Sequence, residues 1–509
     1  MQRIAIIDIG SNSARLVISH IYKNGAYNMV YNQKEALRLS QKVDRKNMLT
    51  EAAFTSTIET MKSFAYMCKI YRVDKTIAVA TAAIRNAYNG VDLVSRVMEE
   101  TGIQLHIISG NTEAYISYLG VINTLDVKNG IIFDLGGGST ELILFQDRQI
   151  VESVSLPLGA VNTTGMFNTR NEMPPNVYSD LSFFITSHLD RYPWLKQQGL
   201  PLIGVGGTAR TVAKMIQRDK KYPATKIHNY AMTAQTFRSF FNQLRETNLE
   251  QRKKISGLSK ERSDIILAGC SIISCLFDVC GSKKMIVSGC GLREGLFFDY
   301  YCKAHNLPLV ADNILQRSRE NILKLYTPDT SHSKHITALA LKMFDSWPKL
   351  HGLSKGYRKL LETAALLHDV GITINFYSHA RHSAYMIQNA QLFGLNHKEQ
   401  VITAAIAGWH NGVSKSYFKD KFYKDMLDEE DWVIVNKLAL ILALAESLDY
   451  SQTNLINNIH PYLDNRGAII KIFADEIPSI EMHQIKGHQN WFRKIFNAEL
   501  TVELANEEK

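Results

Sequence analysis

Two aspartates, Asp8 and Asp134, each end an apolar run and directly precede a short loop of glycine and serine. The two stretches read IAIIDIGSNSARLVI (4–18) and IIFDLGGGSTELIL (131–144). Such loops can turn successive backbone N–H groups toward one ligand, where they bind phosphate oxygens. A carboxylate beside the loop suits Mg²⁺, which prefers oxygen ligands and keeps several waters. The repeat therefore predicts two related lobes that grip one phosphate chain, with Asp134 and, less directly, Asp8 as metal ligands.

The predicted phosphate-binding groups come from three loops. A third glycine stretch, GVGGTAR (204–210), joins a predicted strand to a predicted helix, whose N-terminus favours anions. An ordinary strand-to-helix turn is the alternative for this stretch. The candidates are Gly10, Ser11, Asn12 and Ser13 in the first loop, Gly136, Gly137, Gly138 and Ser139 in the second, and Gly206, Gly207 and Thr208 in the third.

The elements around these loops alternate between strand and helix. Residues 1–31 read as three strands with period-two alternation, and residues 51–122 read as helix, strand, helix, strand and helix. The same order returns from about residue 129 and closes with MIVSGCGLREGLFF (285–298). Beyond residue 313 the pattern changes to long helices, and from Gly467 it alternates again. The sequence thus predicts a duplicated α/β half, a helical domain and a small strand-containing end.

Composition sets broader limits. A chain of 509 residues needs several cores, and 45% hydrophobic with 21% charged residues is ordinary for a globular protein. No apolar run is long enough to span a bilayer, and the six cysteines lack a C-x-x-C pair, so we expect reduced thiols and a cytoplasmic location. The net charge of +9 suits a polyanionic partner. Acidic residues interrupt both basic clusters, at 251–262 and 415–425, and neither has the aromatic platform of a single-strand binder, so no nucleic-acid partner is predicted.

Four motifs connect the chain to a known family. They are TAAIRNAYN (81–89), SGNTEA (109–114), FDLGGGSTEL (133–142) and SGCGLREG (288–295). In this order they resemble the exopolyphosphatase/guanosine pentaphosphate phosphatase (Ppx/GppA) family, within the superfamily of actin-like ATPases and sugar kinases. The resemblance implies two duplicated actin-like (ribonuclease H-like) domains, over 1–125 and 126–305. It also implies removal of a terminal phosphate from inorganic polyphosphate or from pppGpp, with Mg²⁺.

The resemblance implies that Glu113 is the catalytic base. From the residues alone, a carboxylate at that turn could align the attacking water, or could simply be an acid in the first turn of a helix. Glu141 is either a second cleft carboxylate or an exposed strand residue, and Arg85 either grips phosphate or pairs with an acid such as Glu113. Arg293 and Glu294 are expected to have a structural role, in closing the fold, rather than to contact the ligand directly. Asn162 stands where some relatives have arginine.

The helical half contains a second candidate site. His335, His368, Asp369 and Asp449 follow one another in the order H…HD…D and resemble HD-domain phosphohydrolases. Imidazoles with carboxylates suit a transition metal and a metal-bound water. One hypothesis is therefore a metal site within an HD-like domain over 312–460, followed by a small α+β domain over 461–509. The other is that this half only extends a polyanion channel and builds a homodimer.

Several functions remain open from the sequence. The leading hypothesis is an exopolyphosphatase that releases one orthophosphate at a time, and the runner-up is a pppGpp 5'-phosphohydrolase. An actin-like ATPase or sugar kinase would need an adenine pocket beside the third loop. A non-catalytic sensor of pppGpp or ppGpp is a further alternative, although the acids Glu113, Asp134 and Glu141 disfavour it.

Overall fold

The computed structural model describes residues 1–327, 330–410, 421–465 and 467–505. Two compact units make up the chain, unit 1 over Met1–Ile314 and unit 2 over Leu315–Lys509. No helix among the described residues is both long enough and apolar enough to cross a membrane. The six cysteines, all within the described residues, form no disulfide.

Unit 1 begins with a sheet in the strand order β3-β2-β1-β4-β5. The pairs β1–β2 and β2–β3 are antiparallel, whereas β1–β4 and β4–β5 are parallel. The elements of this half are β1 (Gln2–Ile9), β2 (Ala14–Ile21), β3 (Tyr27–Glu35), η1 (Leu39–Gln41), α1 (Glu51–Ile70), β4 (Lys75–Ala80), α2 (Ala82–Arg85), α3 (Gly90–Thr101), β5 (Leu105–Ile107) and α4 (Gly110–Ile122).

The second sheet repeats this topology in the order β10-β11-β9-β6-β7-β8. Its β6, β7 and β8 pair antiparallel as β1, β2 and β3 do, and β9 lies parallel to β6 as β4 does to β1. The elements are β6 (Gly130–Leu135), β7 (Thr140–Gln146), β8 (Gln149–Leu156), α5 (Ala160–Phe167), α6 (Pro175–Leu189), η2 (Pro193–Leu195), β9 (Leu202–Val205), α7 (Gly206–Asp219), β10 (Tyr230–Thr233), α8 (Ala234–Arg245), α9 (Leu249–Arg252), η3 (Lys260–Arg262), α10 (Ile266–Cys280), β11 (Lys284–Val287) and α11 (Leu292–Ala304).

Alternation along the strands divides the apolar residues of unit 1 among three cores. On β1, Ala5, Ile7 and Ile9 pack in an outer core with α1 and α3, whereas Ile4 and Ile6 face the other side. That inner core also receives alternate residues of β6, β7, β9 and β11 from the second sheet. Because successive strand side chains point to opposite faces, the inner faces of both sheets turn toward one shared layer.

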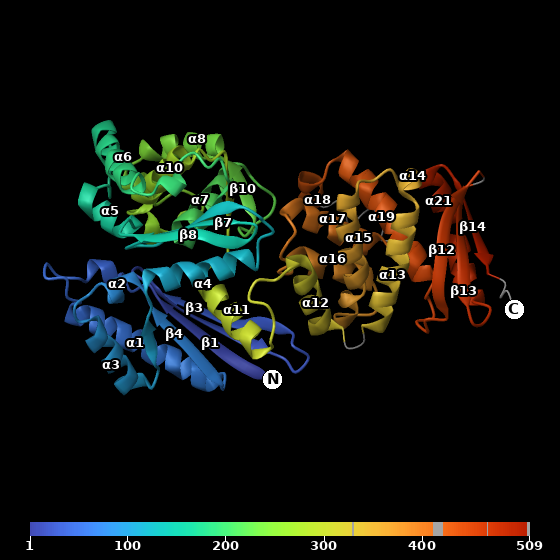
Figure 1. The fold of residues 1–509 in the computed structure, drawn as a ribbon, viewed down its shortest axis with the longest axis horizontal. Helices are drawn as coiled ribbons and strands as arrows, with labels where there is room; N and C mark the ends of the chain where they lie inside the picture. The colour runs from blue at the N-terminus through green and yellow to red at the C-terminus, as the bar shows by residue number, and fades with distance from the viewer. Residues whose placement is uncertain (328–329, 411–420, 466, 506–509) are drawn as a thin grey trace. The chain divides into compact units, whose positions relative to one another are not determined.

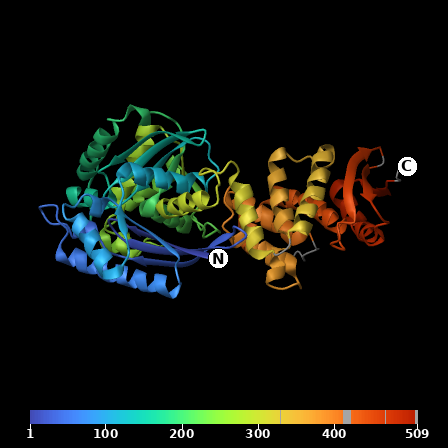
Figure 2. The same ribbon diagram turned by 60° about the horizontal axis from the view of Figure 1, so that its bottom comes forward.

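Helices α4 and α11 fill this shared layer between the two sheets (Figure 1, Figure 2). They approach closely, since a Cβ on Gly120 would lie 2.1 Å from the carbonyl oxygen of Gly291. Although α11 follows the second sheet in sequence, it packs on the first, where Gln2 Nε2 donates to the Tyr300 hydroxyl at 2.7 Å. The predicted division at residues 125 and 126 therefore does not separate the two lobes in space, because α11, which was assigned to the second lobe, packs on the first sheet.

Unit 2 is helical with a three-stranded sheet near the end of the chain. Its elements are α12 (Ile314–Tyr326), α13 (Ser331–Ser346), α14 (Pro348–His351), η4 (Lys355–Tyr357), α15 (Arg358–Leu367), η5 (Val370–Thr373), α16 (His379–Asn389), α17 (His397–Trp409), α18 (Lys421–Met426), α19 (Glu429–Ser447), β12 (Ile456–Asp464), β13 (Gly467–Ala474), α20 (Ser479–Gly487), α21 (Gln489–Phe496) and β14 (Glu499–Leu504).

The small sheet shares its hydrophobic core with the helices of unit 2. Ile456, Ile470 and Phe492 belong to the same buried cluster as residues of α13, α15, α17 and α19. Strand β12 begins at Ile456, ahead of the boundary that the sequence placed at 460 and 461. The structure thus differs from a separate terminal domain, because the apolar face of the sheet is covered by the helical core.

Candidate functional site

The two duplicated loops have the same turn and lie against each other in unit 1. Gly10 N donates to Ser13 O at 3.1 Å, and Gly136 N donates to Ser139 O at 2.9 Å. A Cβ on Gly138 would lie 3.1 Å from Ser11 Oγ, so the loops touch across the gap between the lobes. Glycine here permits the close approach. The twin loops therefore converge on one place, as the repeat predicted.

Each loop is held from behind through its carbonyl groups. Helix α5 donates to the second loop, with Ala160 N to Gly136 O at 3.0 Å and Val161 N to Gly137 O at 2.8 Å. Asn162 Nδ2 donates to Gly138 O at 3.0 Å, so the asparagine that replaces an arginine of some relatives braces the loop. Because C=O and N–H of one peptide point in opposite directions, the following N–H groups are turned away from α5.

Asp8 and Asp134 occupy equivalent positions on the inner faces of the two sheets. Each continues the alternation of the inward apolar residues, and each pairs in register with the neighbouring strand, Asp8 with Arg15 and Asp134 with Glu141. Ser117 Oγ of α4 donates to Asp134 Oδ2 at 2.7 Å. Burial raises the pKa of Asp134 and raises that of Asp8 to about 6. Two carboxylates that are hard to ionise without a cation fit a Mg²⁺ ion that retains waters.

Glu113 lies in the first turn of α4, where Ser109 caps the helix by accepting from Thr112 N at 3.1 Å. Arg85 Nη1 donates to Glu113 Oε2 at 2.8 Å, which is the ion-pair alternative foreseen for this arginine. Burial, followed by the charge of Glu141, raises the pKa of Glu113 well above its ordinary value, and Arg85 opposes that rise. The carboxylate is therefore poised to hold a proton more readily than a surface glutamate.

Glu141 is buried behind the second loop. Its Oε1 accepts from Ser139 Oγ and from Ser155 Oγ, both at 2.8 Å. Burial and the neighbouring Asp134 raise its pKa. Glu141 is therefore not an exposed strand residue, and it is not among the described residues that line the cavity. Its carboxylate instead fixes the orientation of the Ser139 hydroxyl.

Four arginines from separate elements meet in the same place: Arg15 on β2, Arg210 on α7, Arg262 on η3 and Arg293 on α11. Burial lowers the pKa of Arg15 and of Arg262 to about 10, and the nearby arginines Arg293 and Arg210 respectively add to this effect. Crowded guanidinium groups of this kind are stabilised by a bound anion, and each can donate two parallel hydrogen bonds to phosphate oxygens.

These groups surround a cavity of about 130 Å³ between the two lobes of unit 1. Most of the candidates that the sequence named line it, whereas Thr208, Glu141 and Arg85 do not. Thr208 turns the other way, since a Cβ on Gly269 of α10 would lie 2.5 Å from its Cγ2. The candidates that line the cavity are Asp8, Gly10, Ser11, Asn12, Ser13, Glu113, Asp134, Gly136, Gly137, Gly138, Ser139, Gly206 and Gly207.

A second cavity of about 410 Å³ adjoins the first, because both include Gly138 and Ser139 in their walls. Arg85, Ser109, Asn111 and Ser155 also line it. Its hydroxyl, amide and guanidinium groups are donors suited to anionic oxygens. The polar surface thus continues past the glycine loops toward α2 and β8.

The arginines and Glu294 are what sequence reasoning missed. Arg210 lies three residues after Gly207 and Arg262 lies in a basic run, so neither carries a local signal that points to the cavity. Arg293 and Glu294 were expected to be structural, yet both line the cavity. Glu294 also has the expected closing role, since its Oε2 accepts from Gly291 N at 2.9 Å.

In unit 2 the structure corrects the candidate quartet. His368 and Asp369 lie together with His332 and Glu446, so His332 takes the place given to His335, and Glu446 the place given to Asp449. His335 and Asp449 are absent from this group among the described residues. Asp449 instead accepts from His332 Nδ1 at 2.8 Å. Residues three apart on a helix share one face, so periodicity alone did not separate the members of either pair.

Two family profiles match the chain, one after the other. The profile of the Ppx/GppA phosphatase family matches residues 17–304, and that of Ppx/GppA phosphatase, domain III, matches residues 314–489. A bifunctional 3-dehydroquinate synthase/phosphatase of Fusobacterium nucleatum is 30% identical over 298 residues, which cover 56% of this chain and 44% of that protein. The chain therefore spans less than half the length of this curated relative.

Solved structures resemble the chain over about the same extent. The crystal structure of the Aquifex aeolicus member of the Ppx/GppA family is 30% identical, with a TM-score of 0.53, and the match covers 60% of this chain and 98% of that one. An exopolyphosphatase from Cytophaga hutchinsonii shares the fold at 24% identity and a TM-score of 0.56, over 61% of this chain and 100% of that one. With both profiles matched in order along most of its length, the chain belongs to the Ppx/GppA phosphatase family.

Proposed function

We propose that the chain is an exopolyphosphatase that releases terminal orthophosphate from inorganic polyphosphate by Mg²⁺-assisted hydrolysis. The observation that carries this proposal is the cavity of unit 1, where two glycine–serine loops and four arginines face two aspartates and Glu113. Such a surface offers donors for phosphate oxygens on every side and a carboxylate for one proton.

The chain's own residues account for the steps of the reaction. The loops and arginines hold the terminal phosphoryl group, and Glu113 orients a water in line with the anhydride bond and accepts its proton. The water oxygen bonds to the terminal phosphorus while the P–O bond to the bridging oxygen breaks, and the shortened chain keeps that oxygen with its charge. Arg85 positions Glu113, and Glu141 positions Ser139 of the second loop. Mg²⁺, held by Asp8 and Asp134, would neutralise phosphate oxygens.

Polyphosphate suits these walls better than a nucleotide. Among the described residues that line the two adjoining cavities there is no aromatic side chain on which a guanine or adenine would stack. The second cavity instead continues the row of hydroxyl and amide donors, which matches a repeating chain of phosphates. A nucleoside would leave its base against polar groups and lose the stacking energy that base recognition uses.

A phosphate-release assay with Mg²⁺ tests the proposal by comparing long-chain polyphosphate, pppGpp and ATP. We expect polyphosphate to be the best substrate, and Glu113→Gln to lower kcat by a factor of about 10²–10⁴. Glu152→Gln, an exposed change on the neighbouring strand β8, is the matched control and should leave turnover unchanged. Preferred hydrolysis of pppGpp would transfer the proposal to that substrate, and ATP turnover without polyphosphate hydrolysis would overturn it.

The arginines are tested on a single helix. Arg210→Gln removes a guanidinium that lines the cavity, whereas Arg218→Gln changes an exposed arginine at the other end of α7. We expect Arg210→Gln to lower kcat/KM by about 10²-fold or more, since it removes a charged donor aimed at the reacting group. Equal activity of the two variants would contradict the placement of the phosphate among these arginines.

A further inference from the structure

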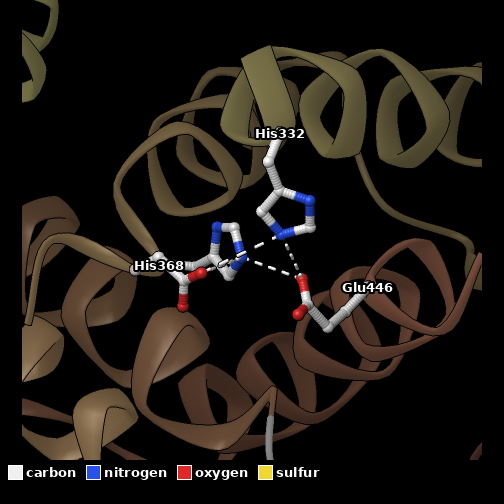
Figure 3. Close-up of side chains that lie close together, drawn as sticks. His332, His368 and Glu446 are labelled. Carbon is white, nitrogen blue, oxygen red and sulfur yellow. Dashed lines mark ion pairs between the residues drawn. The ribbon is translucent and has the colours of Figure 1, made fainter. Parts of the chain in front are cut away.

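Unit 2 contains a cluster of histidines and carboxylates that the phosphatase site of unit 1 does not use. His332, His368 and Glu446 come from three different segments and point toward one another (Figure 3). His332 lies in the first turn of α13, Glu446 lies near the end of α19, and His368 with Asp369 directly follows α15. Two more histidines complete the cluster: His379 at the start of α16 and His410 directly after α17.

The cluster consists of two groups that share one carboxylate. In the first, possible ligand atoms of His332, His368, Asp369 and Glu446 all lie within 4.8 Å of one another, and in the second those of Asp369, His379 and His410 do. The two oxygens of Asp369 divide between the groups. Its Oδ2 lies 3.5 Å from His368 Nε2, and its Oδ1 lies 3.3 Å from His379 Nε2. Asp369 therefore stands where a bridging carboxylate stands in a two-metal site.

Each histidine of the cluster is held from behind through Nδ1. The Nδ1 atoms of His368, His379 and His410 lie 2.8, 3.1 and 2.5 Å from the backbone oxygens of residues 365, 376 and 407. His332 Nδ1 lies 2.8 Å from Asp449 Oδ2. Because a carbonyl oxygen only accepts, Nδ1 must carry the proton, and the neutral ring then directs the lone pair of Nε2 into the cluster. Metal-binding histidines are oriented in this way.

The atoms at the centre of the cluster are poorly satisfied. Within the described part of the chain, five of them are buried and form no hydrogen bond of good geometry, although some lie at ion-pair distance from one another: the Nε2 atoms of His332, His368 and His410, Oδ1 of Asp369 and Oε2 of Glu446. Burying a polar atom without a well-placed partner is unfavourable. That so many converge on one small volume indicates a missing positive partner that bonds to all of them.

A network of imidazolium–carboxylate ion pairs is the competing interpretation, and His410 argues against it. Ion pairs to Asp369 and Glu446 reach His332, His368 and His379, with His368 Nε2 at 2.8 Å from Glu446 Oε2. None reaches His410 among the described residues, and its side chain is only 2% exposed. Its inward Nε2 faces two other imidazoles, with ring centroids 5.0 Å away for His368 and 5.6 Å for His379. A metal ion satisfies this lone pair where no acid does.

We propose that unit 2 binds two divalent transition-metal ions bridged by Asp369. His332, His368 and Glu446 hold one ion together with Asp369, and His379 and His410 hold the other. Mixed imidazole and carboxylate donors suit Mn²⁺, Fe²⁺, Co²⁺, Ni²⁺ or Zn²⁺ rather than Mg²⁺ alone. When bound, such a pair would supply a Lewis acid for a phosphoryl oxygen and an activated water that attacks phosphorus.

The test measures metal on the full chain, stripped with a chelator and then equilibrated with Mn²⁺ or Zn²⁺. Elemental analysis of the dialysed protein should show two more ions per chain for the wild type than for Asp369→Asn. His410→Ala should lose one ion. His335→Ala, three residues from His332 on the same helix but outside the cluster, should lose none.

Two readouts keep the proposal open to refutation if a variant folds poorly. The midpoint temperature of thermal unfolding should rise when metal is added to the wild type, because a ligand that binds the folded state stabilises it. The rise should be smaller in His410→Ala. The electron paramagnetic resonance spectrum of the Mn²⁺-loaded wild type should show exchange coupling between two ions. A wild type that binds no more metal than Asp369→Asn, or a spectrum of isolated ions only, would overturn the two-metal site.

Discussion

At the scale of single residues, the ion pair of Arg85 and Glu113 sets the electrostatic surroundings of the carboxylate that we propose as the base. Glu113 is buried beside another carboxylate, and both effects raise its pKa. A base must be ionised to accept a proton, so a glutamate in this position needs a positive neighbour. Arg85 supplies that charge at 2.8 Å without lining the cavity itself.

This arrangement predicts how activity depends on pH. Removing the guanidinium in Arg85→Met takes away the interaction that lowers the pKa of Glu113, so that pKa rises. The acid limb of the kcat/KM profile should therefore move to higher pH, by about one unit or more. Arg85→Lys keeps a positive charge and should shift the limb less. A profile of Arg85→Met that superimposes on the wild type would show that Glu113 is not the group that titrates.

At the scale of elements, the crossing of α4 and α11 ties the two lobes, and both helices carry residues of the site. Glu113 and Ser117 lie on α4, and Arg293 and Glu294 lie on α11. The helices meet through glycine, where a Cβ on Gly295 would come within 1.8 Å of the carbonyl oxygen of Ile116. Because the two helices are packed this closely, any change in their separation would shift the site residues that they carry.

Alanine at this crossing should therefore destabilise unit 1. Gly120→Ala forces a Cβ against the backbone of Gly291 and should lower the free energy of unfolding by about 1–3 kcal/mol. The control is Gly165→Ala on α5, where a Cβ meets nothing within 4 Å; it should be neutral or stabilising by up to about 1 kcal/mol. Urea unfolding measures both. Equal stabilities would mean that the two helices pack less tightly than described.

At the scale of the whole molecule, charge favours a long polyanion. The chain carries a net charge of +9, and four arginines line one cavity. Dissolved ions screen attraction between charges beyond a distance of about 10 Å at 0.1 M salt. Under the proposed function, the distant part of this attraction would act on the remote phosphates of a long chain, whereas contacts in the cavity would hold the terminal phosphate.

We therefore expect added salt to weaken substrate binding, seen as a higher KM, more than it slows the chemical step, seen as kcat. Raising the ionic strength should increase KM for long-chain polyphosphate several-fold while kcat changes little, and the effect should be smaller for a short-chain substrate with fewer charges. Steady-state kinetics over a salt series measures both values. If KM for the long chain does not depend on salt, the protein recognises only the terminal phosphate.

The amino-acid sequence predicted the duplicated α/β lobes, the glycine–serine loops and the aspartates Asp8 and Asp134 beside them, whereas Glu113 was singled out by the family resemblance. These features are local, because strand alternation and loop composition are written in consecutive residues, and the repeat places equivalent residues in equivalent turns. The meeting of Arg15, Arg210, Arg262 and Arg293 depended on the tertiary structure. They come from four elements far apart in the chain, and only the packing of α4 and α11 between the sheets brings those elements together.

The same division holds in unit 2. Histidine and carboxylate content predicted a metal-binding cluster, yet the chain offers His332 beside His335 and Glu446 beside Asp449. In each pair the two residues lie three apart on one helix face or at its end, so spacing does not rank them. The packing of α13, α15 and α19 selects the members of the cluster, because it directs the side chains of His332 and Glu446 toward Asp369. Asp449 instead contacts Nδ1, on the other side of the His332 ring.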